Sequence, residues 1–434
     1  MTVSIPILGS RAREQFPGTS ITLRATGFRG ELSRVAGAME PGDSDPLPLT
    51  AAAAGTDVML ASWLDMQIEA QQRDDAGLRT RSAAVIQPQL IVPRRPGIAY
   101  AMLQTCADGL SSFVLPLPGD TEEAIFPLDV QATGLTHRAM RVLMWPGHRV
   151  LEPGARETTA RWERFRRPNY ITAVGSGGRR SMPKWGELDT GPILLLLHGT
   201  FGTPDSAFGA WFADPSFGRI VQQYEGRVLA FAHPTLATSV AENLAWLLAQ
   251  LPARTQPVDI VGHGRGGLLA RALAADGRLP VRNVCQVGCP NHGTPLVREP
   301  LAWLNGHVAL LASLPARHAL PTLEGALALM RSVALGAEPG LPGIETVTPE
   351  MVVPTTPGTG AASIRWHTIG AHYAGDAVLY SRDVATDLVV ASEDCHRPGP
   401  EVTDSLRLTG DVVHHHNYFT DARVRERLLD WLCD

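Results

Sequence analysis

Residues 258–270 read Val-Asp-Ile-Val-Gly-His-Gly-Arg-Gly-Gly-Leu-Leu-Ala, and this stretch decides the fold of the second half of the chain. Its opening residues are mostly β-branched, as in a buried strand, and its closing Leu-Leu-Ala is typical of a helix. The glycines between them allow the backbone to pass from strand to helix in a very tight turn. We therefore predict a strand, a sharp turn and a helix that lies close against the strand.

A glycine-rich turn at the start of a helix can also bind phosphate, because free backbone N–H groups there attract anions. The chain lacks the Lys-Ser/Thr pair that follows the last glycine of a P-loop. A phosphate-binding loop is therefore the less favoured interpretation.

Composition limits the class of protein. The 434 residues are enough for two domains, and 44% hydrophobic residues with a net charge of −5 are typical of a soluble globular protein. The chain has no overall basic excess, which argues against a nucleic-acid partner. The N-terminus lacks a basic and apolar leader, no run approaches about 18 apolar residues, and the five cysteines are scattered. We expect a cytoplasmic protein with reduced thiols.

The sequence changes character near residue 186. Residues 1–155 contain β-like stretches and one expected helix near residues 58–72, and they carry no catalytic signature. We interpret them as an α+β or β-rich accessory domain that offers a surface to a protein partner. Residues 156–186 are rich in arginine and are expected to be a basic connector, with peripheral contact to an anionic membrane as the alternative.

Residues 187–434 alternate short apolar runs with helical patterns, which predicts an α/β domain with a mostly parallel sheet flanked by helices. The expected buried strands are residues 192–197, 227–231, 258–261, 284–287 and 364–369. A capping box that begins at Ser239 predicts a helix ending at Pro252. The Leu- and Ala-rich residues 296–350 are expected to form a helical insertion, either a cap over a site or an ordinary subdomain.

Four segments of this half resemble the lipase and esterase branch of the α/β-hydrolase superfamily. They are Leu-Leu-Leu-His-Gly-Thr-Phe-Gly at residues 195–202, Asp-Ile-Val-Gly-His-Gly-Arg-Gly-Gly at 259–267, Val-Gly-Cys-Pro-Asn-His-Gly-Thr-Pro at 287–295 and Thr-Asp-Leu-Val-Val at 386–390. The resemblance covers a little over half of the chain. It implies an α/β-hydrolase fold and the hydrolysis of carboxylic esters by acyl transfer, without a cofactor.

In this superfamily a serine at the turn between strand and helix attacks the ester. The matching position here is Gly264, which has no side chain. The resemblance implies an oxyanion hole made by the backbone amide of Thr200 or Phe201 together with that of Arg265. It assigns the acid of the triad to Asp387, with Asp383 and Asp394 as alternatives.

The base is expected among the consecutive histidines His414, His415 and His416. His415 is favoured because its His-x-x-Tyr-Phe spacing resembles that of similar hydrolases, while His414 and His416 remain alternatives. Three histidines in a row also raise the question of a metal. Adjacent residues on a strand or loop point in different directions and no matching acidic cluster is evident, so we expect no metal site.

Gly264 leaves two hypotheses. In the first, the native protein is a serine ester hydrolase and this chain is an engineered inactive form of it. In the second, it is a natural pseudo-hydrolase that serves as a binding or scaffolding module. The retained acid and histidine favour the first, because a protein released from catalysis has no chemical reason to keep them. The apolar insertion favours an apolar ester or a lipid as the substrate.

Overall fold

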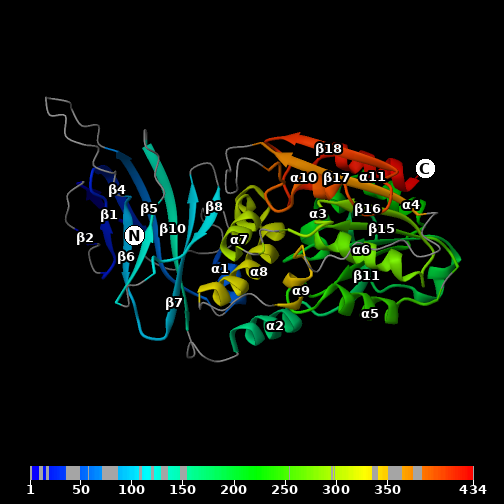
Figure 1. Cartoon of the computed structure of the whole chain (residues 1–434), viewed down its shortest axis with the longest axis horizontal. Helices are drawn as coiled ribbons and strands as arrows, with labels where there is room; N and C mark the ends of the chain where they lie inside the picture. The colour runs from blue at the N-terminus through cyan, green and yellow to red at the C-terminus, as the bar shows by residue number, and fades with distance from the viewer. Residues whose placement is uncertain are drawn as a thin grey trace. The chain divides into compact units, whose positions relative to one another are not determined.

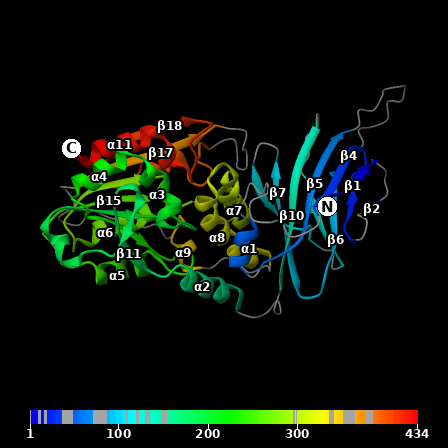
Figure 2. The ribbon, with the colours of Figure 1, turned by 180° about the vertical axis from the view of Figure 1, so that it is seen from behind.

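The structure is a computed structural model that describes residues 2–8, 13–15, 19–35, 49–56, 58–70, 87–106, 110–118, 122–128, 135–146, 154–253, 255–294, 297, 299–334, 341–349, 364–374 and 384–433. The chain divides into two compact units (Figures 1 and 2). One unit contains residues 1–152 and 334–336, and the other contains residues 153–333 and 337–434.

The N-terminal unit is rich in β-structure, as its sequence predicts. Its larger sheet has the order β1 (Thr2–Ile7), β4 (Phe28–Val35), β5 (Met59–Ala70), β10 (Leu135–Pro146), β7 (Ile98–Cys106) and β8 (Ser111–Val114). Its smaller sheet has the order β2 (Glu14–Gln15), β3 (Thr22–Arg24), β6 (Gln89–Pro93) and β9 (Glu123–Pro127), and a short helix, α1, spans Leu49–Gly55. Side chains from both sheets share one apolar core.

The helix expected near residues 58–72 is wrong, because this segment forms strand β5. Leu64, Met66 and Ile68 are fully buried, whereas the residues between them are more exposed. This burial has the period of two that belongs to a strand with one face on a core. Pairing with β4 and β10 on both sides satisfies its backbone, which the sequence of the segment alone does not reveal.

The C-terminal unit is built on an eight-stranded sheet. Its order is β12 (Arg180–Ser181), β11 (Tyr170–Val174), β14 (Val228–Ala232), β13 (Ile193–Leu197), β15 (Val258–His263), β16 (Val281–Val287), β17 (Arg365–Tyr373) and β18 (Asp404–Gly410). All neighbours from β14 to β18 are parallel, and β11 and β12 are antiparallel at one edge. This crossover order with helices on both faces is the α/β-hydrolase fold, which confirms the predicted fold class.

The run of aliphatic residues in β13 explains how the layers form. Leu194 and Leu196 point into a core shared with α3 (Pro204–Ala213), α4 (Ser216–Gln223) and α11 (Ala422–Cys433). Ile193, Leu195 and Leu197 point into the opposite core, shared with α5 (Val240–Gln250) and α6 (Arg265–Asp276). Both views place α11 and α5 on opposite sides of the sheet. The strand is apolar at every position because both of its faces are covered.

The structure corrects the expectation of a basic connector at residues 156–186. Residues Gly154–Arg166 form helix α2, and β11 and β12 extend the sheet, so this segment is part of the C-terminal unit. Most of its arginines are exposed, but Glu163 on α2 is fully buried. The charge pattern therefore belongs to the outer face of a packed helix and an edge hairpin.

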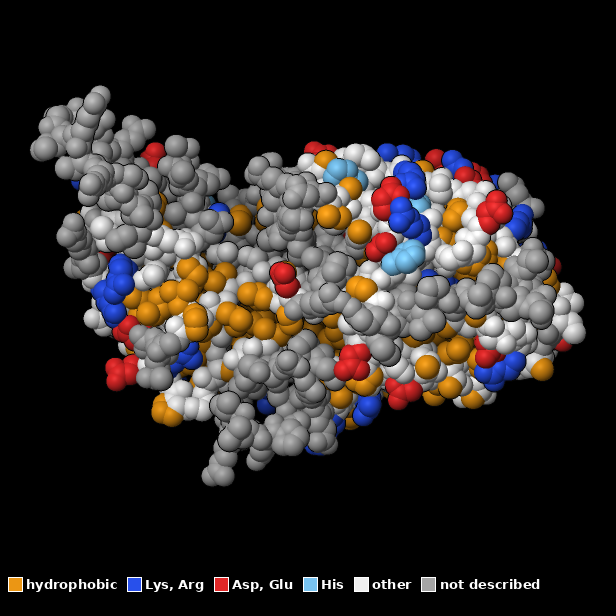
Figure 3. Space-filling model, viewed as in Figure 1, with side chains coloured by type: hydrophobic (Ala, Val, Ile, Leu, Met, Phe, Trp, Pro, Cys, Tyr) orange, Lys and Arg blue, Asp and Glu red, His pale blue; other side chains and the backbone are white. Residues whose placement is uncertain are grey.

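The Leu- and Ala-rich insertion between β16 and β17 contains helices α7 (Pro300–Val308), α8 (Ala316–Ala334) and α9 (Pro342–Glu345). Leu304, Val308 and Leu311 are fully buried, in agreement with their helical spacing. Helix α8 packs against α2, where the hydroxyl of Thr159 donates to the carbonyl of Ala328 at 3.1 Å. None of the helices in the described part of the chain is long and apolar enough to cross a membrane. On the face seen in Figure 3, basic and acidic side chains of this unit are interspersed.

Candidate active site

Gly264 lies at the sharp turn between β15 and α6, in a backbone conformation that strongly favours glycine. Its φ of 53° and ψ of −125° place it outside the regions that side chains readily tolerate. Two residues later, a Cβ on Gly266 would overlap the carbonyl of Leu197 on β13. The glycine pattern thus brings α6 against the sheet and leaves position 264 at the carboxyl end of the central strand.

The side chains of Asp387 and His415 meet beside this turn. The Nδ1 atom of His415 lies 2.8 Å from Oδ2 of Asp387, and the backbone N–H of His415 donates to the Asp387 carbonyl at 3.0 Å. Asp387 is 0% exposed and His415 is 4% exposed. Burial opposes ionisation of Asp387, but the charge and hydrogen bond of His415 outweigh it, and the pKa of the carboxyl is lowered. The aspartate is therefore an anion that can orient the imidazole.

Three further donors hold the Asp387 carboxylate. The backbone N–H groups of Val389 and Val390 donate to Oδ1 at 3.0 and 2.7 Å, and the hydroxyl of Tyr418 donates to Oδ2 at 2.9 Å. The Tyr418 oxygen also accepts from the N–H of Ala371 at 2.9 Å. The hydrogen bond of Tyr418 to Asp387 was not predicted from the sequence, although the position of Tyr418 three residues after His415 was a usable signal.

The alternative acids do not take this place. Asp394 lies on α10 (Ser392–Cys395), where its Oδ1 atom is 3.5 Å from Nδ1 of His292. Asp383 lies outside the described residues.

His415 faces the missing side chain. If Gly264 carried a Cβ atom, that atom would lie 3.0 Å from Nε2 of His415 and 3.4 Å from its Cε1. A hydroxyl on that Cβ would therefore be within hydrogen-bond reach of Nε2 once the ring had moved back by a few tenths of an ångström. The structure thus brings three of the predicted positions, 264, 387 and 415, next to one another.

The neighbouring histidines have other partners. Nε2 of His416 lies 3.2 Å from Nδ1 of His307 on α7. The Nδ1 atom of His414 accepts a long hydrogen bond from the N–H of His416 at 3.4 Å. Among the described residues, no three His, Cys, Asp or Glu side chains are grouped as metal ligands would be. Of the three histidines, only His415 contacts Asp387 through its ring.

The predicted oxyanion donors differ in their surroundings. The N–H of Phe201 donates to the hydroxyl of Thr235 at 3.1 Å, so this amide is already engaged. Thr200 and Arg265, by contrast, line a small cavity together with Gly264 and His415. The geometry therefore favours the amides of Thr200 and Arg265 over that of Phe201.

Buried charges fix the loops around the site. Glu163 accepts hydrogen bonds from the N–H groups of Thr235, Leu236 and Ala237 at 2.6–2.7 Å, and from the Thr235 hydroxyl at 3.0 Å. Because Thr235 in turn holds the Phe201 amide, this carboxylate supports the loop that carries Thr200. The Arg265 side chain is also buried and donates to the Thr238 carbonyl at 2.5 Å. The buried role of Glu163 was not predicted, because residues 156–186 were expected to form a solvated connector.

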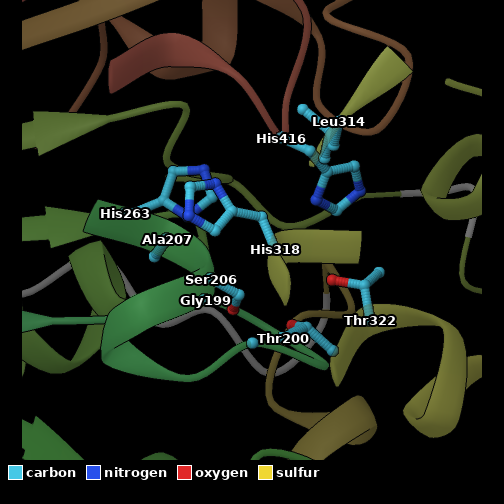
Figure 4. A pocket seen from close by; sticks show the side chains of 10 residues that line it. Gly199, Thr200, Ser206, Ala207, His263, Leu314, His318, Thr322 and His416 are labelled. Carbon is cyan, nitrogen blue, oxygen red and sulfur yellow. The ribbon is translucent and has the colours of Figure 1, made fainter. Parts of the chain in front are cut away.

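A second small cavity lies next to the first and shares Thr200 with it (Figure 4). Its lining is more polar and includes Ser206, His263, His318 and Thr322, which the figure shows around a common space. The wall of the first cavity combines apolar side chains, among them Trp303, Val347 and Val390, with the polar side chains of Arg265, His307 and His415.

The glycines at 262, 264 and 267 also have the Gly-x-Gly-x-x-Gly spacing of a dinucleotide-binding turn. In this structure, however, the N–H of Gly264 is bonded to the Val287 carbonyl at 2.9 Å. The start of α6 is covered by the His415 ring. Because this amide is engaged and the turn is covered, the phosphate-binding interpretation remains disfavoured.

The chain is similar to one protein family and to several solved structures. A family model described as "Domain of unknown function (DUF7379)" matches residues 164–433, and no curated protein matches. Similar solved structures include the lipase BlEst2 of Bacillus licheniformis, with 15% identity, a TM-score of 0.38 and coverage of 60% of this chain and 97% of that chain. A putative lipase from Acinetobacter baumannii has 14% identity, a TM-score of 0.38 and coverage of 63% and 93%. A structure from work on carboxylesterases of Nitrososphaera gargenis has 16% identity, a TM-score of 0.35 and coverage of 61% and 93%.

Proposed function

The chain belongs to the family described as domain of unknown function DUF7379, and we propose that it is the form without a nucleophile of a serine ester hydrolase. One observation carries the proposal. The imidazole of His415, held by Asp387 at 2.8 Å, lies 3.0 Å from the point that a Cβ at position 264 would occupy. A hydrogen-bonded acid and base aimed at an empty nucleophile position have no evident structural purpose other than acyl transfer.

With serine at position 264, each group has a defined step. His415 Nε2 takes the proton of the hydroxyl as the oxygen attacks the ester carbonyl, and Asp387 stabilises the imidazolium that forms. The backbone amides of Thr200 and Arg265 hold the oxyanion. The imidazolium then gives its proton to the leaving alcohol, and water, activated by the same histidine, releases the acid.

We propose an apolar ester as the substrate. Part of the wall of the cavity next to Gly264 is apolar, from Trp303, Val347 and Val390, and this part suits an acyl chain. Trp303 comes from helix α7 of the insertion, so in this proposal the insertion acts as the expected cap.

The second candidate function is a binding module, and Gly264 itself favours it. Glycine accepts the strained turn without cost, so this sequence keeps the fold while it cannot form an acyl-enzyme. The codon at position 264 in the natural gene distinguishes the two. A serine codon means that the glycine was engineered, and a glycine codon supports the pseudo-hydrolase.

The experiment that tests the proposal restores the hydroxyl. Gly264→Ser should react with a fluorophosphonate probe and hydrolyse 4-nitrophenyl esters, whereas Gly264→Ala and the parent chain should do neither. The alanine variant has the same backbone strain without the nucleophile and is the matched control. A folded serine variant that neither labels nor turns over any ester of increasing acyl length would contradict the proposal.

A further inference from the structure

The imidazole of His307 has one nitrogen without a hydrogen-bond partner among the described residues. The side chain is 1% exposed. Its Nδ1 atom lies 3.2 Å from Nε2 of His416, and its Nε2 atom has no hydrogen-bond partner within the described part of the chain. Leaving a buried polar atom unpaired has a substantial free-energy cost, so an unpaired atom in a site calls for a ligand.

His307 lines the cavity next to Gly264 in the candidate active site. That cavity is lined by Gly264 and His415 on the sheet side and by Trp303 and His307 from helix α7. The ring planes of His307 and His415 are nearly perpendicular, at 86°, with centroids 5.9 Å apart. A molecule bound against Gly264 therefore meets His307 on the insertion side.

Packing holds the His307 ring in one orientation. The ring makes edge contacts with Trp303 and Phe201, each with a centroid distance of 4.8 Å. Together with the His416 contact, these neighbours prevent Nε2 from turning towards another partner. Burial also lowers the pKa of His307 well below its ordinary value, with the charges of His415 and His263 adding to the effect, so the ring is neutral.

We propose that His307 determines substrate binding by donating a hydrogen bond from Nε2 to an oxygen of the bound ester. This inference rests on the proposed function and adds a residue that the triad does not include. Ester oxygens are acceptors only, so Nε2 must carry the proton, and Nδ1 then accepts from Nε2–H of His416. The substrate class that fits is a carboxylic ester with an apolar acyl chain packed against Trp303 and Val347, and with an oxygen at His307.

Two substitutions separate the nitrogens of His307. His307→Asn keeps an amide near the position of Nδ1, next to His416, and deletes Nε2. His307→Gln places its amide near the position of Nε2 and gives up Nδ1. If Nε2 binds the ester, the asparagine variant should bind it about fivefold more weakly, and the glutamine variant should stay close to the parent. If His307 acts only through His416, the order reverses.

The first measurement uses the chain with Gly264, which we expect to bind 4-nitrophenyl butyrate without consuming it, because position 264 has no hydroxyl to attack the ester. Calorimetric titration gives the Kd for the parent and for both His307 variants. Equal Kd values for the two variants, the reversed order, or no binding by the parent would each overturn the inference. Because no turnover is needed, this result is independent of whether position 264 once held serine.

A second measurement uses the parent chain alone, so it does not depend on whether a variant folds. In the parent labelled with ¹⁵N-histidine, the ring resonances of His307 should show the Nε2–H tautomer, and they should shift when 4-nitrophenyl butyrate binds. Unchanged resonances at a saturating concentration of ester would overturn the inference. Fluorophosphonate labelling of Gly264→Ser, with and without His307→Asn, reports on the proposed function separately. Labelling of both forms is expected, because the probe reacts with the serine whether or not His307 Nε2 is present.

Discussion

His415 is positioned for a side chain that Gly264 does not have. Its Nε2 atom lies 3.0 Å from the place of a Cβ at position 264, and Asp387 holds the other side of the ring at 2.8 Å. One side of the ring is therefore held by the buried carboxylate of Asp387, and the other side faces the backbone of Gly264, which has no side chain.

Placing serine at position 264 should lower the stability of the protein. A residue with a side chain is strained in the backbone conformation of this turn, and its Cβ is also in close contact with His415. We therefore expect Gly264→Ser and Gly264→Ala to lose about 1–3 kcal/mol of unfolding free energy. Urea unfolding of both variants measures this. Gly277→Ala is the matched control, because Gly277 also has a positive φ, of 76°, but open space around it. A loss at position 264 no larger than at position 277 would mean that the elbow is not specially strained.

Replacing the acid should abolish most of the activity of the serine form. In the Gly264→Ser background, Asp387→Asn removes the charge that stabilises the imidazolium and allows the wrong tautomer, so kcat should fall about 10³–10⁴-fold. Steady-state kinetics with a 4-nitrophenyl ester give the value. Asp394→Asn should leave kcat near that of the Gly264→Ser parent. A comparable loss in both variants would contradict the assignment of Asp387.

Glu163 should be important for stability even though it lies far from Gly264 in the sequence. Glu163→Gln puts an amide among groups that all donate to the carboxylate, and it removes the charge that faces buried Arg167 and Arg265. We expect a loss of about 2–4 kcal/mol in unfolding free energy. Glu324→Gln, which breaks only a 3.6 Å ion pair with Arg167, should cost less than about 1 kcal/mol. Equal effects would show that the four hydrogen bonds to Glu163 contribute little.

The C-terminal unit should lose stability in mild acid because its histidines are buried in the neutral form. Burial lowers the pKa of His198, His263 and His414 to about 3, against about 6.5 in an unfolded chain. Between these values the unfolded state binds protons that the folded state does not. The stabilisation is therefore present above about pH 6.5 and is lost as the pH falls towards 3.

Each such histidine should add a slope of about 1.4 kcal/mol per pH unit below about pH 6. Urea unfolding between pH 7.5 and pH 5 measures the slope, and His414→Asn should reduce it by about one proton. An unfolding free energy that stays constant over this range would refute the prediction.

Much of the site was predictable because its residues follow local rules. The strand, turn and helix at residues 258–270 required only the β-branched residues of the strand and the chemistry of glycine, and the helix that begins after Ser239 shows the predicted capping box. Gly264, Asp387 and His415 were found because the family pattern fixes them relative to strand ends. The failures occurred where sequence pattern is ambiguous. Residues 58–70 carry apolar side chains that fit a helix or a strand, and their partners on β4 and β10 decide between the two.

The sequence by itself determined that the chain has a strand–turn–helix elbow without a nucleophile, because glycine content and hydrophobic periodicity are local properties. Only the tertiary structure decided which histidine contacts Asp387 and that Tyr418 and Glu163 support the site. It also decided that Nε2 of His307 has no hydrogen-bond partner among the described residues. The physical reason is distance along the chain. These contacts join segments tens to hundreds of residues apart, and their geometry exists only once the sheet has brought the ends of β13, β15, β16 and β17 together at one edge.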